Sequence, residues 1–183
     1  MQVAIIGAGP LGRRLALACM RAGFTVRLED VMPANLHHAQ EYLRQQLGPS
    51  AMPSVGFVST IEEAVREADL AIDCVPDELE SKLEIFCLLD RMAPPRTVLM
   101  TPTRNLSIAD LASCTYRAEQ CVAIVADTRE LALETDSELS QTHSRAEILL
   151  RIPPQASETT LESARKFWEG LGLSPRFEID QAA

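Results

Sequence analysis

The chain has 183 residues, a formal net charge of −9 at pH 7 and a pI near 4.8. This length allows one well-packed core and is short for two domains. The acidic balance argues against nucleic acid or an anionic membrane surface as a partner. No apolar run approaches the roughly 20 residues of a membrane-spanning helix, and the N-terminus lacks the basic segment of a secretory signal. We therefore expect a cytoplasmic protein.

The cysteines point to the same compartment. They are five in number, scattered, and include no C-x-x-C pair. This pattern is typical of reduced thiols and favours neither a disulfide framework nor a zinc site. We expect no metal centre.

The N-terminal segment has the pattern of a dinucleotide-binding turn. Apolar residues at 3–6 predict a buried strand, and Gly7, Gly9 and Gly12 follow it at the G-x-G-x-x-G spacing. The three glycines would allow a tight turn, close approach of a pyrophosphate, and packing of the next helix on the strand. The helix predicted over 11–22 would direct its free N–H groups at the phosphates. The residues expected to bind the cofactor here are Gly7, Gly9, Pro10, Leu11 and Gly12.

An acidic residue follows the second predicted strand, which covers 25–29. Asp30 lies 18 positions after Gly12, where a carboxylate would accept hydrogen bonds from the adenine ribose hydroxyls and repel a 2′-phosphate. Neighbouring Val31 and Met32 offer no arginine to meet such a phosphate. The sequence thus predicts binding of NAD or NADH in preference to the phosphorylated cofactors. The alternative is an ordinary strand–turn–helix with glycines in its turn.

Strands and helices alternate along the rest of the chain. This alternation predicts an α/β fold with a Rossmann-type doubly wound, mostly parallel sheet, in a single domain over 1–180. The acid-rich stretch 127–145 interrupts the alternation and is predicted to be an insertion, either a functional lid or a solvated loop. Further helices are expected at 33–47, 61–68, 78–92, 107–113 and 157–170, and further strands at 55–58, 70–75, 97–100, 121–126, 148–152 and 174–179.

Four segments together resemble the NAD-binding domain of the 3-hydroxyacyl-CoA dehydrogenase family. They are the glycine-rich opening at 7–13 and the stretches 73–86, 99–113 and 159–172. The resemblance implies an NAD-dependent oxidoreductase of fatty-acid metabolism. It also implies that a carboxylate and a lysine five positions later, which map onto Asp77 and Lys82, approach the nicotinamide end of NAD.

The resemblance does not extend to the positions of the family's catalytic residues. In the family, a histidine paired with a glutamate takes the proton of the 3-hydroxyl while hydride passes to NAD. The histidine position falls on Val125, the glutamate position on Arg151, and a serine position of the family on Arg104. Valine cannot accept a proton. No catalytic residue is therefore predicted, although His143 in the insertion could serve as a relocated base.

The resemblance also implies a C-terminal helical domain that the 183 residues do not contain. We expect the remaining Rossmann unit to expose apolar surface near Phe167, Trp168, Leu171 and Phe177, and to form a homodimer that buries it. A self-sufficient core containing Phe167 and Trp168 is the alternative. Two functions stay open: a dehydrogenase with altered chemistry completed by a partner chain, and a non-catalytic NAD(H)-binding module. Arg104 and Arg151 could hold an acyl-CoA or a small anionic ligand.

Overall fold

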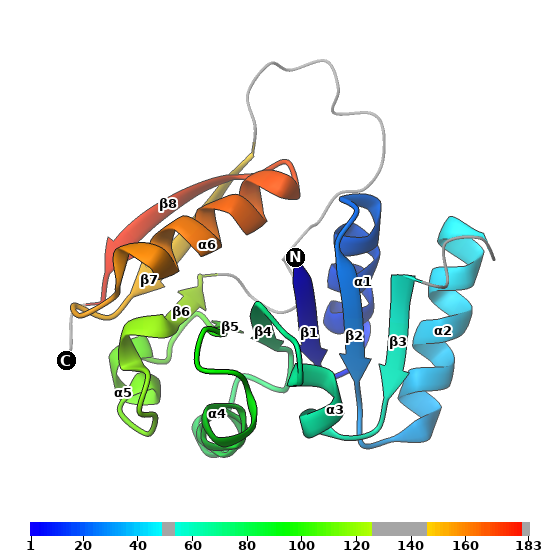
Figure 1. Cartoon of the computed structure of the whole chain (residues 1–183), viewed down its shortest axis with the longest axis horizontal. Helices are drawn as coiled ribbons and strands as arrows, with labels where there is room; N and C mark the ends of the chain where they lie inside the picture. Colours follow the sequence, from blue (N-terminus) through cyan, green and yellow to red (C-terminus); the bar gives the residue numbers. More distant parts are fainter. Residues whose placement is uncertain (49–53, 126–145, 181–183) are drawn as a thin grey trace.

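The computed structural model describes residues 1–48, 54–125 and 146–180 (Figure 1). These residues contain an eight-stranded sheet with the strand order β3-β2-β1-β4-β5-β6-β7-β8. Strands β1 to β6 run parallel, β7 pairs antiparallel with β6, and β8 is parallel to β7. The order 3-2-1-4-5-6 is that of a Rossmann dinucleotide-binding sheet, so the predicted fold class is confirmed.

The predicted helices and strands are all present in the described ranges, while the predicted insertion at 127–145 lies outside them. The strands are β1 (Gln2–Ile6), β2 (Thr25–Glu29), β3 (Val55–Val58), β4 (Leu70–Asp73), β5 (Val98–Pro102), β6 (Cys121–Ile124), β7 (Glu147–Ile152) and β8 (Ser174–Ile179). The helices are α1 (Pro10–Arg21), α2 (Pro33–Leu47), α3 (Ile61–Val65), α4 (Leu79–Met92), α5 (Ile108–Ala112), the 3₁₀ turn η2 (Ala118–Gln120) and α6 (Glu158–Gly170).

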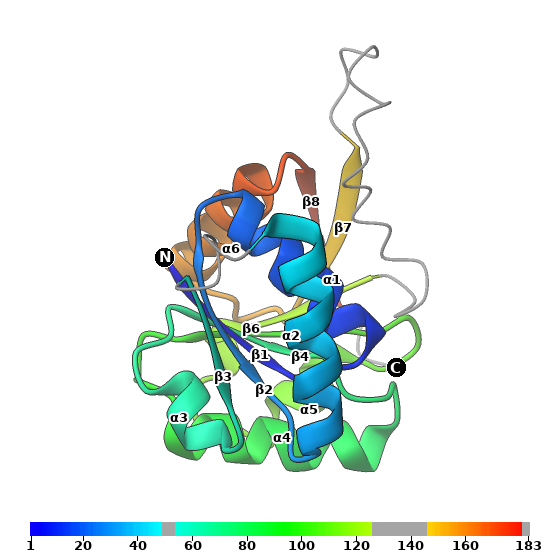
Figure 2. The ribbon, with the colours of Figure 1, turned by 90° about the vertical axis from the view of Figure 1, so that its right-hand side faces the viewer.

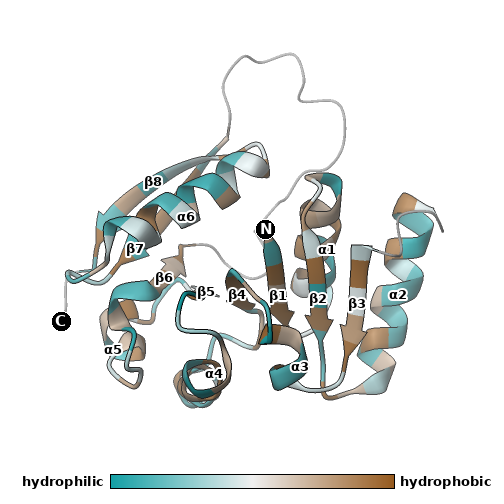
Figure 3. Ribbon diagram, in the orientation of Figure 1, coloured by the Kyte–Doolittle hydropathy of each residue, from teal (hydrophilic) through white to brown (hydrophobic). Residues whose placement is uncertain are grey.

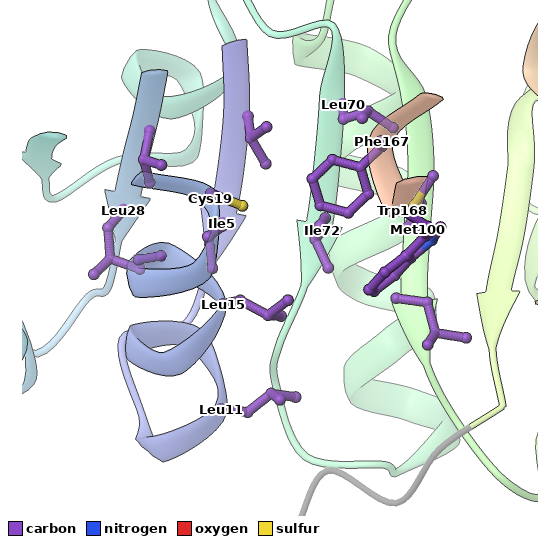
Figure 4. Close-up of a cluster of buried hydrophobic side chains, with 14 of the residues drawn as sticks. Ile5, Leu11, Leu15, Cys19, Leu28, Leu70, Ile72, Met100, Phe167 and Trp168 are labelled. Carbon is purple, nitrogen blue, oxygen red and sulfur yellow. The ribbon is translucent and has the colours of Figure 1, made fainter. Parts of the chain in front are cut away.

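Helices cover both faces of the sheet, as Figures 1 and 2 show. Because successive strand residues point to opposite faces, β1 contributes Val3 and Ile5 to one apolar core and Ala4 and Ile6 to the other. The first core packs under α1, α2 and α6, and the second packs under α3, α4 and α5. Figure 4 shows the part of the first core between α1 and α6. The central strands are accordingly apolar, and the outer faces of α2 and α6 carry hydrophilic residues (Figure 3).

Helix α6 completes the first core with two aromatic side chains. Phe167 and Trp168 are fully buried, their rings 4.9 Å apart in a T-shaped contact, and Phe167 stacks on Phe24 at 5.7 Å. The prediction that Phe167 and Trp168 form an exposed apolar edge is therefore wrong. The helix turns its apolar side onto the sheet of its own chain, and Leu171 and Phe177 pack partly buried against the same core.

A close contact between two glycines fixes α1 to the end of β1. A methyl group added at Gly12 would lie 1.8 Å from the carbonyl oxygen of Gly7, so only glycine permits this approach of helix and turn. Gly7 itself has a φ of +102°, a conformation that favours glycine. The two residues hold the N-terminus of α1 directly beside the carboxyl end of β1.

We expect Gly12→Ala to lower the free energy of unfolding by about 3 kcal/mol, because the added methyl group must displace backbone. This exceeds the roughly 1 kcal/mol that alanine gains over glycine inside a helix. Gly9→Ala is the matched control: an added Cβ there meets no atom within 4 Å and φ is −65°, so its cost should stay below about 1 kcal/mol. Urea unfolding of the two variants and the parent protein measures the difference. Equal stability of the two variants would contradict the packing argument.

Candidate functional site

The sheet opens a crevice between the carboxyl ends of β1 and β4. From β1 the chain crosses to α1 on one face, and from β4 it crosses to α4 on the other, so the two connecting loops diverge. Ligands of open α/β sheets bind at such a reversal of strand order. The turn from Gly7 to Gly12 lies here, and no described side chain caps the first turn of α1. Its first N–H groups are therefore available to an anion.

Asp30 ties this turn to the end of β2. Its Oδ2 accepts a hydrogen bond from the backbone N–H of Ala8 at 2.8 Å, and its Oδ1 accepts one from the N–H of Met32 at 2.8 Å. The Asn35 side-chain amide lies 3.1 Å from both oxygens. The sequence prediction thus placed Asp30 and the glycine-rich turn at one site, and the structure brings them together. The contact of Asp30 with a ribose stays a prediction.

A pocket of about 590 Å³ lies beside Gly7 and Asp30, between the ends of β1, β2 and β4 and the helices α3 and α4. Part of its wall is apolar, and four carboxylates also line it: Glu29, Asp30, Glu62 and Glu84. Among the described residues that line it there is no arginine or lysine. The full lining is Ile6, Gly7, Glu29, Asp30, Val31, Ser59, Thr60, Ile61, Glu62, Val75, Glu84, Ile85, Leu88 and Met92.

Sequence reasoning missed Glu29, which is only 6% exposed. Burial, and secondarily the charge of Asp30, raise the pKa of the Glu29 carboxyl to about 7. The available signal was its place on β2, where alternation turns Val26 and Leu28 to one face and Glu29 to the other. A glutamate at a buried strand position needs an explanation of its own.

Lys82 is fully buried beneath the loop that follows β4. Its Nζ lies 3.1 Å from Oδ2 of Asp73, and it donates to Oγ1 of Thr101 at 2.8 Å. Thr101 donates to the same carboxylate oxygen at 2.9 Å, and the Val75 N–H donates to the other at 2.9 Å. Burial raises the pKa of the Asp73 carboxyl, and the Lys82 ammonium opposes this rise. The group links α4 to β4 and β5, while the predicted approach of Lys82 to the nicotinamide stays a prediction.

Asp77 lies on the exposed loop after β4, where its Oδ2 accepts a hydrogen bond from the backbone N–H of Arg104 at 3.3 Å. This contact joins the loops that follow β4 and β5. The resemblance to the family implies that Asp77 approaches the nicotinamide end of NAD. Its contact with the cofactor is a prediction.

The positions matched to the family's chemistry carry no proton acceptor in the structure. Val125 follows β6 and donates its backbone N–H to the Leu149 carbonyl at 2.9 Å. The Nε of Arg151 lies 3.8 Å from Oδ1 of Asp180, which makes a charged pair between β7 and the end of β8. Asp180 also accepts from the Ser107 hydroxyl at 2.7 Å, so Arg151 belongs to an anchoring cluster.

The other candidates for a base are the three histidines of the chain and Glu134, Glu138 and Glu147. His37 and His38 are exposed on α2, and Glu147 is exposed on β7 beside Arg176. His143, Glu134 and Glu138 lie outside the described residues. Residues 1–48, 54–125 and 146–180 contain no group of three or more histidine, cysteine or acidic side chains suited to a metal ion. None of the helices in the same ranges has both the length and the apolar character that crossing a bilayer requires.

Comparison with known proteins decides the family. The family described as "3-hydroxyacyl-CoA dehydrogenase, NAD binding domain" matches residues 2–125. The chain belongs to this family. It is thus an NAD-binding domain of an oxidoreductase family, and the resemblance and the cofactor predicted from the sequence are both confirmed.

Individual relatives agree with this assignment. The probable 3-hydroxybutyryl-CoA dehydrogenase of Bacillus subtilis is 30% identical over 136 residues, which are 67% of this chain and 47% of that protein. The 5-formyl-3-hydroxy-2-methylpyridine 4-carboxylate 5-dehydrogenase of Mesorhizobium japonicum is 32% identical over 120 residues, 60% of this chain and 38% of that protein. The chain spans less than half the length of these curated relatives.

The fold extends beyond the matched region. The crystal structure of (S)-3-hydroxybutyryl-CoA dehydrogenase from Ralstonia eutropha superposes with a TM-score of 0.84 at 20% identity, over 98% of this chain and 64% of that one. The likeness therefore includes β7, α6 and β8. It establishes that the whole described chain has the architecture of this NAD-binding domain.

We expect Lys82→Met to lower the free energy of unfolding by about 3–5 kcal/mol, because it leaves the buried Asp73 carboxylate without its counter-ion. The double variant Asp73→Leu with Lys82→Met removes both charges and should recover most of the loss. Urea unfolding of the three proteins tests this. A stable single variant that only loses affinity for NADH would show that Lys82 acts on the cofactor instead.

Proposed function

We propose that this domain binds NAD(H) across the crevice at β1 and β4, prefers it over the phosphorylated cofactors, and lacks the usual histidine–glutamate chemistry of its family. One observation supports the proposal most strongly: Asp30 is hydrogen-bonded to the glycine-rich turn, and this turn leads into the uncapped N-terminus of α1. Bound there, NAD would supply hydride acceptance at its nicotinamide ring. The chain's own residues hold and orient it.

The pyrophosphate fits the turn on steric and electrostatic grounds. A Cβ atom added at Gly9 would have no other atom within 4 Å, so the space in front of this residue is open. A phosphate can therefore approach the backbone there closely. The N–H groups of the first turn of α1 point to that space, and the helix dipole favours a negative charge there.

The adenosine half fits the adjoining pocket. With the pyrophosphate at the turn and a ribose beside Asp30, the base lies among the apolar side chains of Val31, Ile61, Leu88 and Met92. Val31 is 78% exposed, which suits a residue that covers one face of a ligand. Asp30 and the other carboxylates that line the pocket, Glu62 and Glu84, would repel a 2′-phosphate.

We expect NADH to bind at least tenfold more tightly than NADPH. The 2′-phosphate would meet Asp30 and its acidic neighbours with no cation in the pocket lining. Fluorescence titration at constant ionic strength measures both affinities. Val31→Arg places a cation at an exposed position next to Asp30 and should narrow the preference, since an arginine there accommodates a 2′-phosphate. Equal or tighter NADPH binding by the parent protein would remove the proposed role of Asp30.

The second part of the proposal concerns catalysis. General acid–base help contributes about 10²–10⁴-fold to rate, and the positions of the family's histidine and glutamate hold Val125 and Arg151. We therefore favour a module that binds NAD(H) without oxidising a hydroxyacyl substrate. A dehydrogenase of altered chemistry, completed by a partner chain, is the second candidate, and family membership favours it.

With acetoacetyl-CoA and NADH, the isolated chain should show little or no oxidation of NADH above the rate without protein. The nicotinamide absorbance reports turnover, and NADH fluorescence in the same sample confirms that the cofactor is bound. Turnover in the usual enzymatic range of about 1–10³ s⁻¹ would contradict the proposal. His143→Ala would then be the first variant to make.

Three further elements of the proposal concern the surroundings of the domain. We propose that the chain is cytoplasmic, that its second ligand is an acyl-CoA or a small anion, and that it forms a homodimer. Burial of Phe167 and Trp168 removes their support for the dimer. Edge strand β8, with Ile179 63% exposed, is the surface that now supports it.

A further inference from the structure

Glu29 is a largely buried acid whose carboxyl group opens into the pocket. The residue is 6% exposed and lines the 590 Å³ pocket, and its carboxyl oxygens are not among the buried polar atoms that lack a partner. Its neighbour Asp30, by contrast, accepts from two backbone N–H groups and the Asn35 amide. A carboxyl group that opens into a pocket and is not used within the protein can form hydrogen bonds with a ligand that binds there.

The charged residues that line the pocket with Glu29 are all acidic, while Arg27 lies two residues earlier on the same face of β2 and the Asp73–Lys82 pair lies level with Glu29 in the sheet. Asp30 follows it on the chain, Glu62 faces the pocket from α3, and Glu84 faces it from α4. Burial and the Asp30 charge raise the pKa of the Glu29 carboxyl to about 7. The carboxyl oxygens of Asp30 are already occupied by hydrogen-bond donors of the protein, whereas those of Glu29 open into the pocket.

We propose that Glu29 reads the adenine base of the dinucleotide, pairing as a neutral carboxylic acid with the 6-amino group and an adjacent ring nitrogen. A neutral carboxyl has one O–H donor and one carbonyl acceptor, the same pair that an amide side chain offers to adenine. Adenine presents the complement, an amino donor beside a nitrogen acceptor. The apolar wall formed by Ile61, Leu88 and Met92 would exclude water from this pairing. The inference rests on the proposed function, which places the adenosine half in this pocket.

The test uses NAD and its 1,N⁶-etheno analogue, in which the amino group and the N1 nitrogen are bridged. At pH 6 the parent protein should bind NAD about tenfold more tightly than the analogue, because the analogue cannot donate to Glu29. Glu29→Ala should bind both ligands with equal affinity. Glu29→Gln, which has the same donor and acceptor at every pH, should keep the tenfold preference.

The pH dependence provides an independent readout. Because the neutral carboxyl binds, NAD affinity of the parent protein should be highest below pH 7 and fall about tenfold between pH 6 and pH 8.5. Glu29→Gln should show no such fall. Calorimetric titration of the three proteins with both ligands gives all the constants.

Two results would overturn the inference. Equal binding of NAD and the etheno analogue by the parent protein would show that the base edge is not read. An equal loss of affinity for both ligands in Glu29→Ala would place Glu29 on the ribose. If the parent protein binds no NAD at either pH, the proposed function itself fails, and the inference fails with it.

Discussion

The contact of Gly12 with the Gly7 carbonyl is the constraint on which the binding site depends. It brings the first turn of α1 onto the carboxyl end of β1, where the helix N–H groups face the crevice. Asp30 then holds the turn through the Ala8 N–H. Turn, helix end and β2 are thus one rigid unit. A dinucleotide that binds here would find its phosphate and ribose contacts already in place, so little ordering entropy would be lost.

A second buried interaction fixes the opposite wall of the crevice. Lys82, Asp73 and Thr101 connect α4 to two strands through charge and hydrogen bonds that are inaccessible to water. Buried ion pairs contribute little net stability over an apolar alternative, but their geometry is strongly fixed once formed. This geometry fixes the position of the loop that bears Asp77. The hydrogen bond between Asp77 and the Arg104 N–H in turn connects that loop to the loop after β5.

The sequence predicted the fold because local patterns determine it, and the same patterns placed the glycine-rich turn and Asp30 at one end of the sheet. Strand–glycine–helix spacing and the alternation of elements lead to the Rossmann order without any long-range information. The pattern of α4 was less reliable. The apolar residues Leu79, Leu83, Phe86 and Leu89 recur at a helical spacing that would bury Leu79, but Leu79 is 47% exposed and Lys82 is fully buried. A periodicity argument places a lysine on the solvent side of the helix. It takes no account of an ion-pair partner outside the helix, such as Asp73 nine positions earlier.

Two other differences share this cause. Phe167 and Trp168 were predicted to be exposed, whereas the sheet of the same chain covers them. Glu29 looked like an ordinary strand residue because neither its burial nor the pocket beside it is visible in the chain order. In each case the deciding contact is made by residues distant in sequence.

The account depends on where the dinucleotide lies, and a crystal structure with NADH tests this most directly. The pyrophosphate should lie against the backbone of residues 7–12 at the start of α1, with the adenine base in the pocket between Val31 and Met92. A dinucleotide bound elsewhere, or one whose base lies outside this pocket, would contradict it.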